Sequence, residues 1–290
     1  MKHTIALLTL GAALAAPSAL AATPPAAAPS PLAPVGAALP VSLLDDLTLD
    51  FEGGALAFLQ NDQRYGSQGT PYTHRTIAQD RNLFGAQRLS LEARALDRHT
   101  VIFLYAPLDV TTRVTLGSPL TFRDQTFPAG AVVDHRYLFD GIRATYLYRT
   151  LAQGGLTLDL GATLGVRNAE VSLSQVDGTR FSPERDIGPV PALRARLRYD
   201  PGQGAYALYD LDAGGTLPGI GTVTGGVLDT ALTLGVPLVK GLDGTLRLRY
   251  LAGGATVPNR EILNWAQFAS ASAGFRFSPR LFWAPEPAQR

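Results

Sequence analysis

Hydrophobic and polar residues alternate with a period of two along most of the chain between Leu47 and Phe277. In residues 156–165, for example, Leu, Leu, Leu, Ala and Leu alternate with Thr, Asp, Gly, Thr and Gly. In residues 193–199, arginine occupies every polar position. Successive side chains of a β-strand point to opposite faces, so this pattern predicts strands with one apolar and one polar face.

The same pattern recurs often enough to predict an all-β protein of about ten strands. The strands are expected near residues 47–60, 83–96, 100–116, 135–149, 156–173, 190–199, 205–213, 227–236, 245–255 and 265–277. Long connections (61–82, 117–134, 174–189, 214–226) alternate strictly with short turns (97–99, 151–155, 200–204, 237–244). This order is typical of an antiparallel up-and-down transmembrane β-barrel, in which the short turns are periplasmic.

Alternation alone does not decide which face lies inside, because a soluble barrel would bury the apolar face instead. Three features favour a membrane barrel. Several strands exceed the roughly nine residues that cross a tilted bilayer. The polar face contains many small residues, such as Gly161 and Ser272, which suit a narrow filled interior. Aromatic residues, including Tyr105, Tyr199 and Phe275, gather toward strand ends, as in interfacial girdles.

The N-terminus predicts export and divides the chain into segments. Lys2 and His3 precede an apolar run, which ends at Pro17 and is followed by the small-residue cleavage site at residues 19–21. This pattern predicts a signal peptide over residues 1–21. Residues 22–44, rich in Ala and Pro, read as a periplasmic linker. The barrel is expected over 45–277 and a C-terminal tail over 278–290.

The amino-acid composition argues against several classes of function. The net charge of +1, from 25 basic and 24 acidic residues, argues against a nucleic-acid partner. The chain has no cysteine, so disulfides, thiolate metal sites and thiol nucleophiles are excluded. Nearly all cations are arginines, since Lys2 and Lys240 are the only lysines. No later segment is apolar for long enough to form a membrane-spanning helix.

The end of the predicted barrel carries a resemblance to a known class. Residues 269–277, ASASAGFRF, look like the last strand of an outer-membrane barrel. Together with residues 103–108, 250–255 and 264–268, they resemble an uncharacterised family of small outer-membrane β-barrels. The resemblance implies an outer-membrane location in the bacterial cell envelope and recognition by the barrel-assembly machinery. The chain departs from the class because residues 278–290 continue past the terminal Phe277.

The polar face supplies the candidate functional residues, which we expect to line the lumen, meaning the interior of the barrel. Arginines outnumber acids there by about two to one. One interpretation is a closed interior filled with ion pairs, and another is a porin-like narrow pathway biased toward small anions. The expected lumen-lining residues are Arg88, Glu92, Arg94, Arg143, Asp159, Arg167, Arg194, Arg196, Arg198, Asp210, Asp212, Asp229, Arg247 and Arg249, with Arg149 and Arg276 beside them.

The function predicted is therefore a structural or small-pore outer-membrane barrel that contacts outer-membrane lipid. Two alternatives remain: an outer-membrane enzyme acting on lipid or peptide, and a soluble periplasmic lipid-binding barrel. Asp210 and Asp212 superficially resemble half of the catalytic set of omptin proteases, but the Asp97 and His99 pair lies in a short turn at the opposite rim. The histidines have no ligand-spaced partner, so we expect no catalytic residues, no metal and no cofactor.

Overall fold

The computed structural model describes residues 44–216 and 221–279. The predicted signal peptide, nearly all of the linker and most of the tail lie outside these residues. The strands are β1 (Leu44–Tyr65), β2 (Leu83–Ala95), β3 (His99–Ala106), β4 (Asp109–Thr115), β5 (Leu120–Phe122), β6 (Gln125–Phe127), β7 (Val132–Gln153), β8 (Leu156–Gln175), β9 (Phe181–Tyr199), β10 (Tyr206–Gly215), β11 (Thr224–Val239), β12 (Leu242–Val257) and β13 (Ile262–Phe277). A short 3-10 helix, η2 (Pro258–Arg260), joins β12 to β13. No helix among the described residues is long and apolar enough to cross a membrane.

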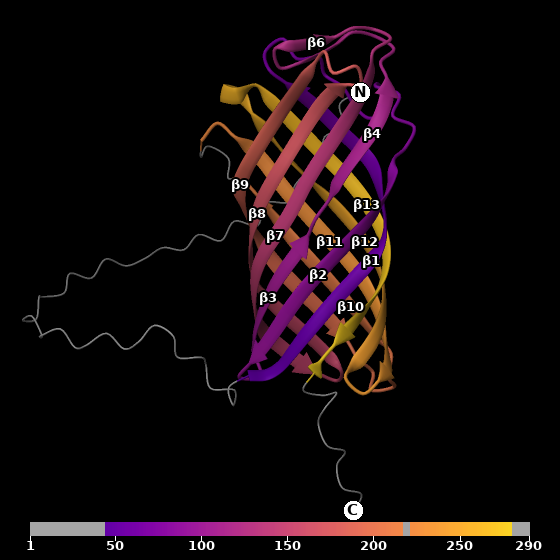
Figure 1. The fold of residues 1–290 in the computed structure, drawn as a ribbon. Coiled ribbons are helices and arrows are strands. Elements are labelled where there is room, and N and C mark those ends of the chain that lie inside the picture. Colours follow the sequence, from indigo (N-terminus) through magenta and orange to yellow (C-terminus); the bar gives the residue numbers. More distant parts are fainter. Residues whose placement is uncertain (1–43, 217–220, 280–290) are drawn as a thin grey trace, which may run out of the picture. The chain divides into compact units, whose positions relative to one another are not determined.

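The strands form a closed antiparallel barrel of ten strands (Figure 1). The ring closes where β1 pairs with β13, from Leu49 opposite Phe277 to Tyr65 opposite Ile262. β3 and β4 together make one crossing, because both pair with β7 and are separated only by Pro107 and Leu108. The predicted fold class is confirmed.

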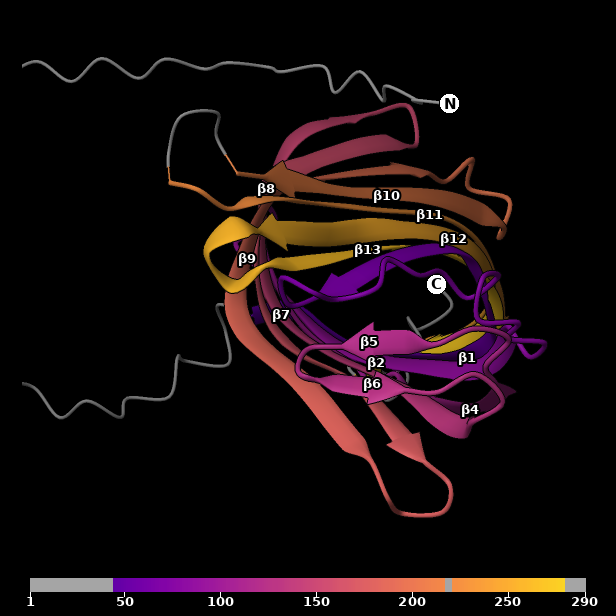
Figure 2. The ribbon, with the colours of Figure 1, turned by 90° about the horizontal axis from the view of Figure 1, so that it is seen from above.

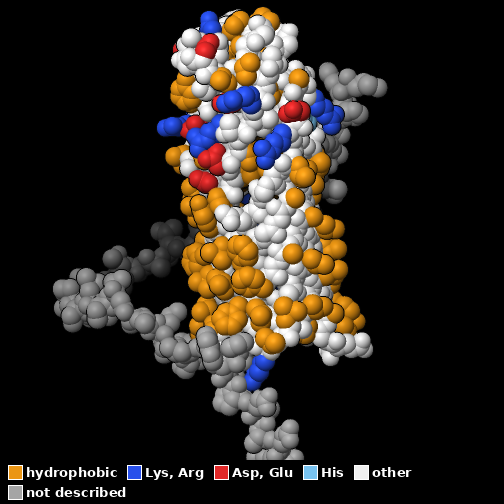
Figure 3. All heavy atoms as spheres, turned by 45° about the vertical axis from the view of Figure 1, so that its right-hand side comes forward, with side chains coloured by type: hydrophobic (Ala, Val, Ile, Leu, Met, Phe, Trp, Pro, Cys, Tyr) orange, Lys and Arg blue, Asp and Glu red, His pale blue; other side chains and the backbone are white. Residues whose placement is uncertain are grey.

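The outer surface is apolar over the lower part of the barrel. Outward side chains there are largely exposed: Phe103 59%, Leu193 72% and Leu248 63%. Figure 3 shows this apolar belt on one face of the molecule, with charged side chains gathered above it. Such side chains exposed in a continuous band require lipid around them. The apolar face therefore points outward, so the chain is an outer-membrane barrel and not a soluble barrel with an apolar interior.

Above the belt the outer surface changes to ion pairs. Arg113 pairs with Asp134 at 2.8 Å, and Arg136 pairs with Asp109 at 2.6 Å. Glu170 accepts from both Arg136 and Arg185. Because charge on a lipid-facing surface is costly, these pairs place the upper parts of β4, β7, β8 and β9 outside the hydrocarbon layer.

The upper end of the barrel is closed by a folded cap, which we call the head: the loop 66–82, the loop 116–131 with the β5–β6 hairpin, and the strand ends that carry them (Figure 2). Gln63 and Tyr72 exchange backbone hydrogen bonds at 2.9 Å, and Thr70 N donates to Thr121 O at 2.8 Å. Phe122 and Phe127 are fully buried. The two loops were predicted only as polar connections, yet they share an apolar core with the upper strands.

One predicted boundary is wrong. Residues 174–189 were expected to form a long loop, but β8 and β9 extend through them and leave only a turn at 176–180. The predicted loop contains the prolines at 183 and 189, which suggested irregular structure because proline removes a ladder donor. They occur in a strand here because their missing N–H groups face an edge that has no partner strand, as shown below.

Candidate functional site: the charged lumen

The polar faces of eight strands place a connected set of charged side chains in the lumen. Most members occupy inward positions between apolar sequence neighbours that face lipid. The network contains the carboxylates of Asp50, Glu52, Glu92, Asp210, Asp212 and Asp229 and the guanidinium groups of Arg88, Arg94, Arg143, Arg194, Arg196, Arg247, Arg249 and Arg276.

Glu52, on β1, is one centre of this network. Its Oε1 lies 3.0 Å from Arg88 Nε, 2.9 Å from Arg247 Nη1 and 3.2 Å from Arg249 Nη2. Its Oε2 accepts a hydrogen bond of 2.9 Å from the Ser272 hydroxyl. One carboxylate thus connects β1 to β2 on one side and to β12 and β13 on the other.

Asp229, on β11, is the second centre and is 1% exposed. It accepts hydrogen bonds of 2.6 Å from Arg249 Nη1 and 2.6 Å from Arg143 Nη1, and Arg88 Nη2 lies 3.7 Å away. Arg143 comes from β7 and Arg88 from β2, on other parts of the wall. These contacts span the barrel from β11 to both sides, so the charged side chains cross the lumen instead of lining an open path.

The two aspartates of β10 extend the network toward β9. Arg194 pairs with Asp210 at 2.6 Å and also with Asp212, which accepts a further hydrogen bond of 2.7 Å from Thr163. Arg196 bridges Asp210 at 3.0 Å and Glu92 at 2.8 Å. Both β10 carboxylates are therefore held by guanidinium groups.

Glu92 and Asp50 complete the network toward the periplasmic end. Arg276 Nη2 lies 3.4 Å from Glu92, and Arg94 lies 3.9 Å from it. Arg247 Nη2 donates to Asp50 at 3.0 Å.

Four of the expected lumen residues, Arg149, Asp159, Arg167 and Arg198, lie outside the network. Asp159 pairs with Arg149 at 3.2 Å near the periplasmic end. Arg198 stacks on the ring of Tyr206, 3.6 Å from its centroid, and pairs with Asp200 in the turn below. Arg167 lies above the network and pairs with Asp186. All the other expected residues are brought together.

Sequence reasoning missed Asp50 and Glu52, although the alternation in β1 was available to find them. Asp50 and Glu52 alternate with Leu49 and Phe51, so both carboxylates fall on the polar face. Their addition changes the charge balance. The network holds eight arginines and six carboxylates, a surplus of two cations instead of a two-to-one excess.

Above the network the lumen is filled by aromatic rings. The ring centroid of Phe58 lies 5.6 Å from that of Phe84, 5.4 Å from Tyr137 and 4.7 Å from Phe268. All four side chains are less than 8% exposed. The rings lie below the head, so ion pairs, an aromatic cluster and a cap follow one another along the barrel.

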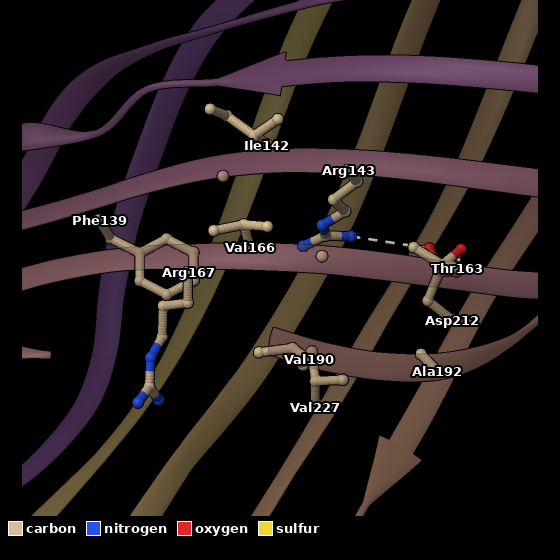
Figure 4. A pocket seen from close by; sticks show the side chains of 12 residues that line it. Phe139, Ile142, Arg143, Thr163, Val166, Arg167, Val190, Ala192, Asp212 and Val227 are labelled. Atoms are coloured by element: carbon tan, nitrogen blue, oxygen red, sulfur yellow. Dashed lines mark hydrogen bonds and ion pairs between the residues drawn. The ribbon is translucent and has the colours of Figure 1, made fainter. Parts of the chain in front are cut away.

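Two small cavities accompany this packing. One of about 40 Å³ lies beside Arg143, Thr163 and Asp212 (Figure 4), and another of about 20 Å³ is lined by Tyr65, Arg167 and Asn264. Each holds a few waters at most.

The described residues include no group of three or more His, Asp and Glu side chains placed to hold a metal ion. Asp210 and Asp212 lie in the middle of β10. His99 is the first residue of β3, at the periplasmic rim, and its Nδ1 lies 2.8 Å from the Tyr146 hydroxyl. A general base must reach its proton directly or through one water. The structure does not bring this histidine and the two aspartates together.

No protein-family model matches the chain, and no curated protein matches it. Solved structures similar to it include the outer membrane protease OmpT of Escherichia coli, with 9% identity, 81% of this chain and 97% of that chain covered, and a TM-score of 0.46. A second is Ail of Yersinia pestis in complex with the heparin analogue sucrose octasulfate, with 12% identity, 80% of this chain and 99% of that chain covered, and a TM-score of 0.37. A third is the toluene transporter TodX of Pseudomonas putida, with 8% identity, 81% of this chain and 90% of that chain covered, and a TM-score of 0.34. At these scores and identities the likeness gives no basis for assigning a function.

Proposed function

We propose that this protein is a structural outer-membrane barrel whose lumen does not conduct, and that it holds the head at the cell surface. The observation that supports this most directly is the crossing of the lumen by Arg143 and Arg88 toward Asp229, with Arg249 joining Asp229 to Glu52. A hydrated pathway would have to pass between these ion pairs, beside which the cavity next to Arg143 and Asp212 measures only about 40 Å³.

The charge balance also supports a closed interior. Burying an ion is unfavourable unless it is paired, so a network of partnered charges is the expected filling of a narrow barrel. Eight strands enclose an interior just wide enough for side chains, and ten strands add little. The surplus of two guanidinium groups could attract anions, but a favourable potential moves no ion where side chains occupy the space.

Planar-bilayer recording of the purified barrel tests the proposal. We expect no regular conductance steps from the wild type. Steady small currents would contradict the proposal and promote the small-pore alternative. In that case anions should permeate preferentially, and replacing Arg194, Arg196 and Arg198 together with glutamate should reverse the selectivity, because the charge that faces the lumen changes sign.

We also propose that the protein is not an enzyme. The two β10 carboxylates are held by Arg194 and Arg196, so neither is free to activate a water. The expected partners are the lipid around the apolar belt and the barrel-assembly machinery, which would meet the chain at Phe277. This residue pairs with Leu49 where the ring closes.

A further inference from the structure

The seam between β9 and β10 is paired over only part of its length, as is the seam between β2 and the β3–β4 crossing, where β4 pairs in the described residues only with β7. β9 pairs with β10 from Tyr199 opposite Ala207 to Leu193 opposite Ala213. Above Leu193, β9 continues for twelve residues to Phe181, and in the described part of the chain this upper portion pairs only with β8. The last described β10–β11 strand pair is Gly215 opposite Gly226.

The direction of the β9 backbone groups follows from hydrogen bonds at its two ends. Gln175 N donates to Arg180 O at 2.8 Å, and Asp200 N donates to Gly155 O at 2.8 Å. In an antiparallel pair, the N–H and C=O of one residue point to the same side, and the side alternates along the strand. The β8–β9 register has no shift. Even-numbered residues of β9 therefore point to β8, and odd-numbered residues point to the seam.

All three prolines of β9 are at odd positions, 183, 189 and 191. Pro183 and Pro189 each remove an N–H that would otherwise face the seam beyond the described β10 residues, and Pro191, which Gly214 still approaches, removes one at the margin of the paired part. An unpaired backbone donor in the hydrocarbon layer costs several kcal/mol, and proline at a free edge also prevents pairing with another strand. The sequence is thus suited to keep this edge unpaired.

A strap of ion pairs limits the unpaired seam at its upper end. Arg260, from η2, donates to Glu184 at 2.5 Å, to Asp186 at 3.1 Å and to the carbonyl of Arg185 at 3.2 Å. Arg185 is an odd-numbered residue, and its carbonyl does point to the seam. Above the last pair at Leu193, Gly214 of β10 still lies against Pro191 and Ala192. Between these residues and the strap, residues 187–190 leave a free edge of about 13 Å.

This edge lies at the upper margin of the apolar belt. Pro189 pairs with Val166 of β8, and Val166 pairs with Ile142 of β7. Val166 and Ile142 point outward and are 46% and 54% exposed. The next outward residue of β7 is Asp140, where the belt ends. The surroundings of the free edge are therefore the acyl chains of the outer leaflet, close to their head groups.

The 40 Å³ cavity lies directly behind this edge, inside the wall (Figure 4). Val190 and Ala192 line it from β9, Val227 lines it from β11 across the seam, and Gly165 leaves room on β8. Its lining is mainly apolar, and Arg143 closes its inner end. An apolar cavity of about 150 Å³ holds a benzene molecule. The smaller cavity here can therefore accept only the end of an acyl chain, unless the seam widens.

We propose that the seam between β9 and the β10–β11 hairpin is a lateral opening of the barrel, and that the cavity lined by Val190, Ala192 and Val227 binds the end of an acyl chain from an outer-leaflet lipid. The opening leaves the charged network in place, so it is separate from conduction along the barrel axis. Its occupant is set by location, because the mouth of the seam opens onto acyl chains at the upper margin of the belt.

Photocrosslinking of the wild-type barrel tests this directly. The protein is reconstituted in vesicles of phosphatidylcholine that carries a diazirine at the end of one acyl chain, irradiated, and mapped by mass spectrometry. Adducts are expected on the inward residues Val190, Ala192 and Val227 as well as on the outward residues Leu193 and Leu228. Adducts confined to the outward pair would overturn the proposal, since any lipid-facing side chain should give them.

Ala192→Phe provides a variant that fills the cavity. It should lose the adducts on Val190 and Val227 and keep those on Leu193 and Leu228, provided that heat-modified gel mobility shows a folded barrel. Inward adducts that persist in the folded variant would show that labelling does not depend on this cavity and would also reject the proposal. Should this variant not fold, the wild-type adduct pattern still decides between the two outcomes.

Discussion

Replacing Asp229 with asparagine tests the idea that the lumen is held by a compensated charge network. The change keeps the shape of the side chain and removes its charge. Asp229 is 1% exposed and accepts two hydrogen bonds of 2.6 Å from guanidinium groups, with a third arginine at 3.7 Å. Arg143, Arg249 and Arg88 would each lose a buried anionic partner.

The magnitude follows from these contacts. A hydrogen bond to a charged group contributes about 1.5–3 kcal/mol, and two are weakened here. Breaking a buried ion pair by removing one partner costs about 3–5 kcal/mol, since it leaves a buried charge uncompensated. Asparagine can still accept one hydrogen bond, so we expect a loss of about 3 kcal/mol in the free energy of unfolding.

Asp200→Asn is the matched control, because it makes the same chemical change in an exposed pair. The Asp200 side chain is 40% exposed and lies 2.8 Å from Arg198 in a periplasmic turn. Exposed pairs contribute about 0–1 kcal/mol. Urea unfolding in lipid vesicles, followed by tryptophan fluorescence and gel mobility, measures both variants. If the two lost the same stability, the network would not hold the barrel, and the closed-lumen argument would fail.

The remaining predictions concern the belt and the head. Leu248→Arg, in the middle of β12, should lower the free energy of unfolding by about 2–4 kcal/mol in the same assay. Leu197→Arg, two residues from the periplasmic end of β9, should lower it by less. Equal losses would contradict the position of the belt. His135, on β7 above the belt, is buried against the head with its Nδ1 3.2 Å from Gln79, and this burial lowers its pKa to about 4. Because the pKa of an unfolded histidine is about 6.5, the free energy of unfolding of the head should fall by about 3 kcal/mol as the pH falls from 6.5 to 4. Hydrogen exchange over residues 66–82 would show the loss, and it should be absent in His135→Gln.

The two-residue alternation predicted the strands and their faces because lipid and lumen impose opposite polarity on neighbouring positions. It placed Arg196 inside and Leu197 outside, as the structure has them. The alternation gave a wrong prediction where a different constraint determines the structure. Pro183 and Pro189 suggested a loop, since the sequence does not show which strand edge lacks a partner. Pairing depends on how far the adjacent hairpin extends, which is a property of the assembled barrel.

The head was missed for a related reason. Phe122 and Phe127 lie in a segment rich in Gly, Pro and Asp, which indicates turns, and two isolated aromatics give no periodic pattern. Their burial arises from contacts with Tyr65 and the upper strands, far away in sequence. For the lumen, the alternation identified inward positions but not partners. It could not show that Asp50 and Glu52 balance the arginines of β12.

The length of β7 sets how far the head reaches from the cell. β7 has 22 residues, whereas about 9–11 suffice to cross the hydrocarbon layer at a tilt of about 45°. The nine residues from Val132 to Asp140 lie above the belt and, at about 3.3 Å each along the tilted strand, lift the β5–β6 hairpin roughly 20 Å above that layer. The polar head groups extend only about 5–8 Å beyond it on each side. The barrel thus acts as a rigid stalk of fixed height, and macromolecules that cannot approach the lipid itself can still touch its tip.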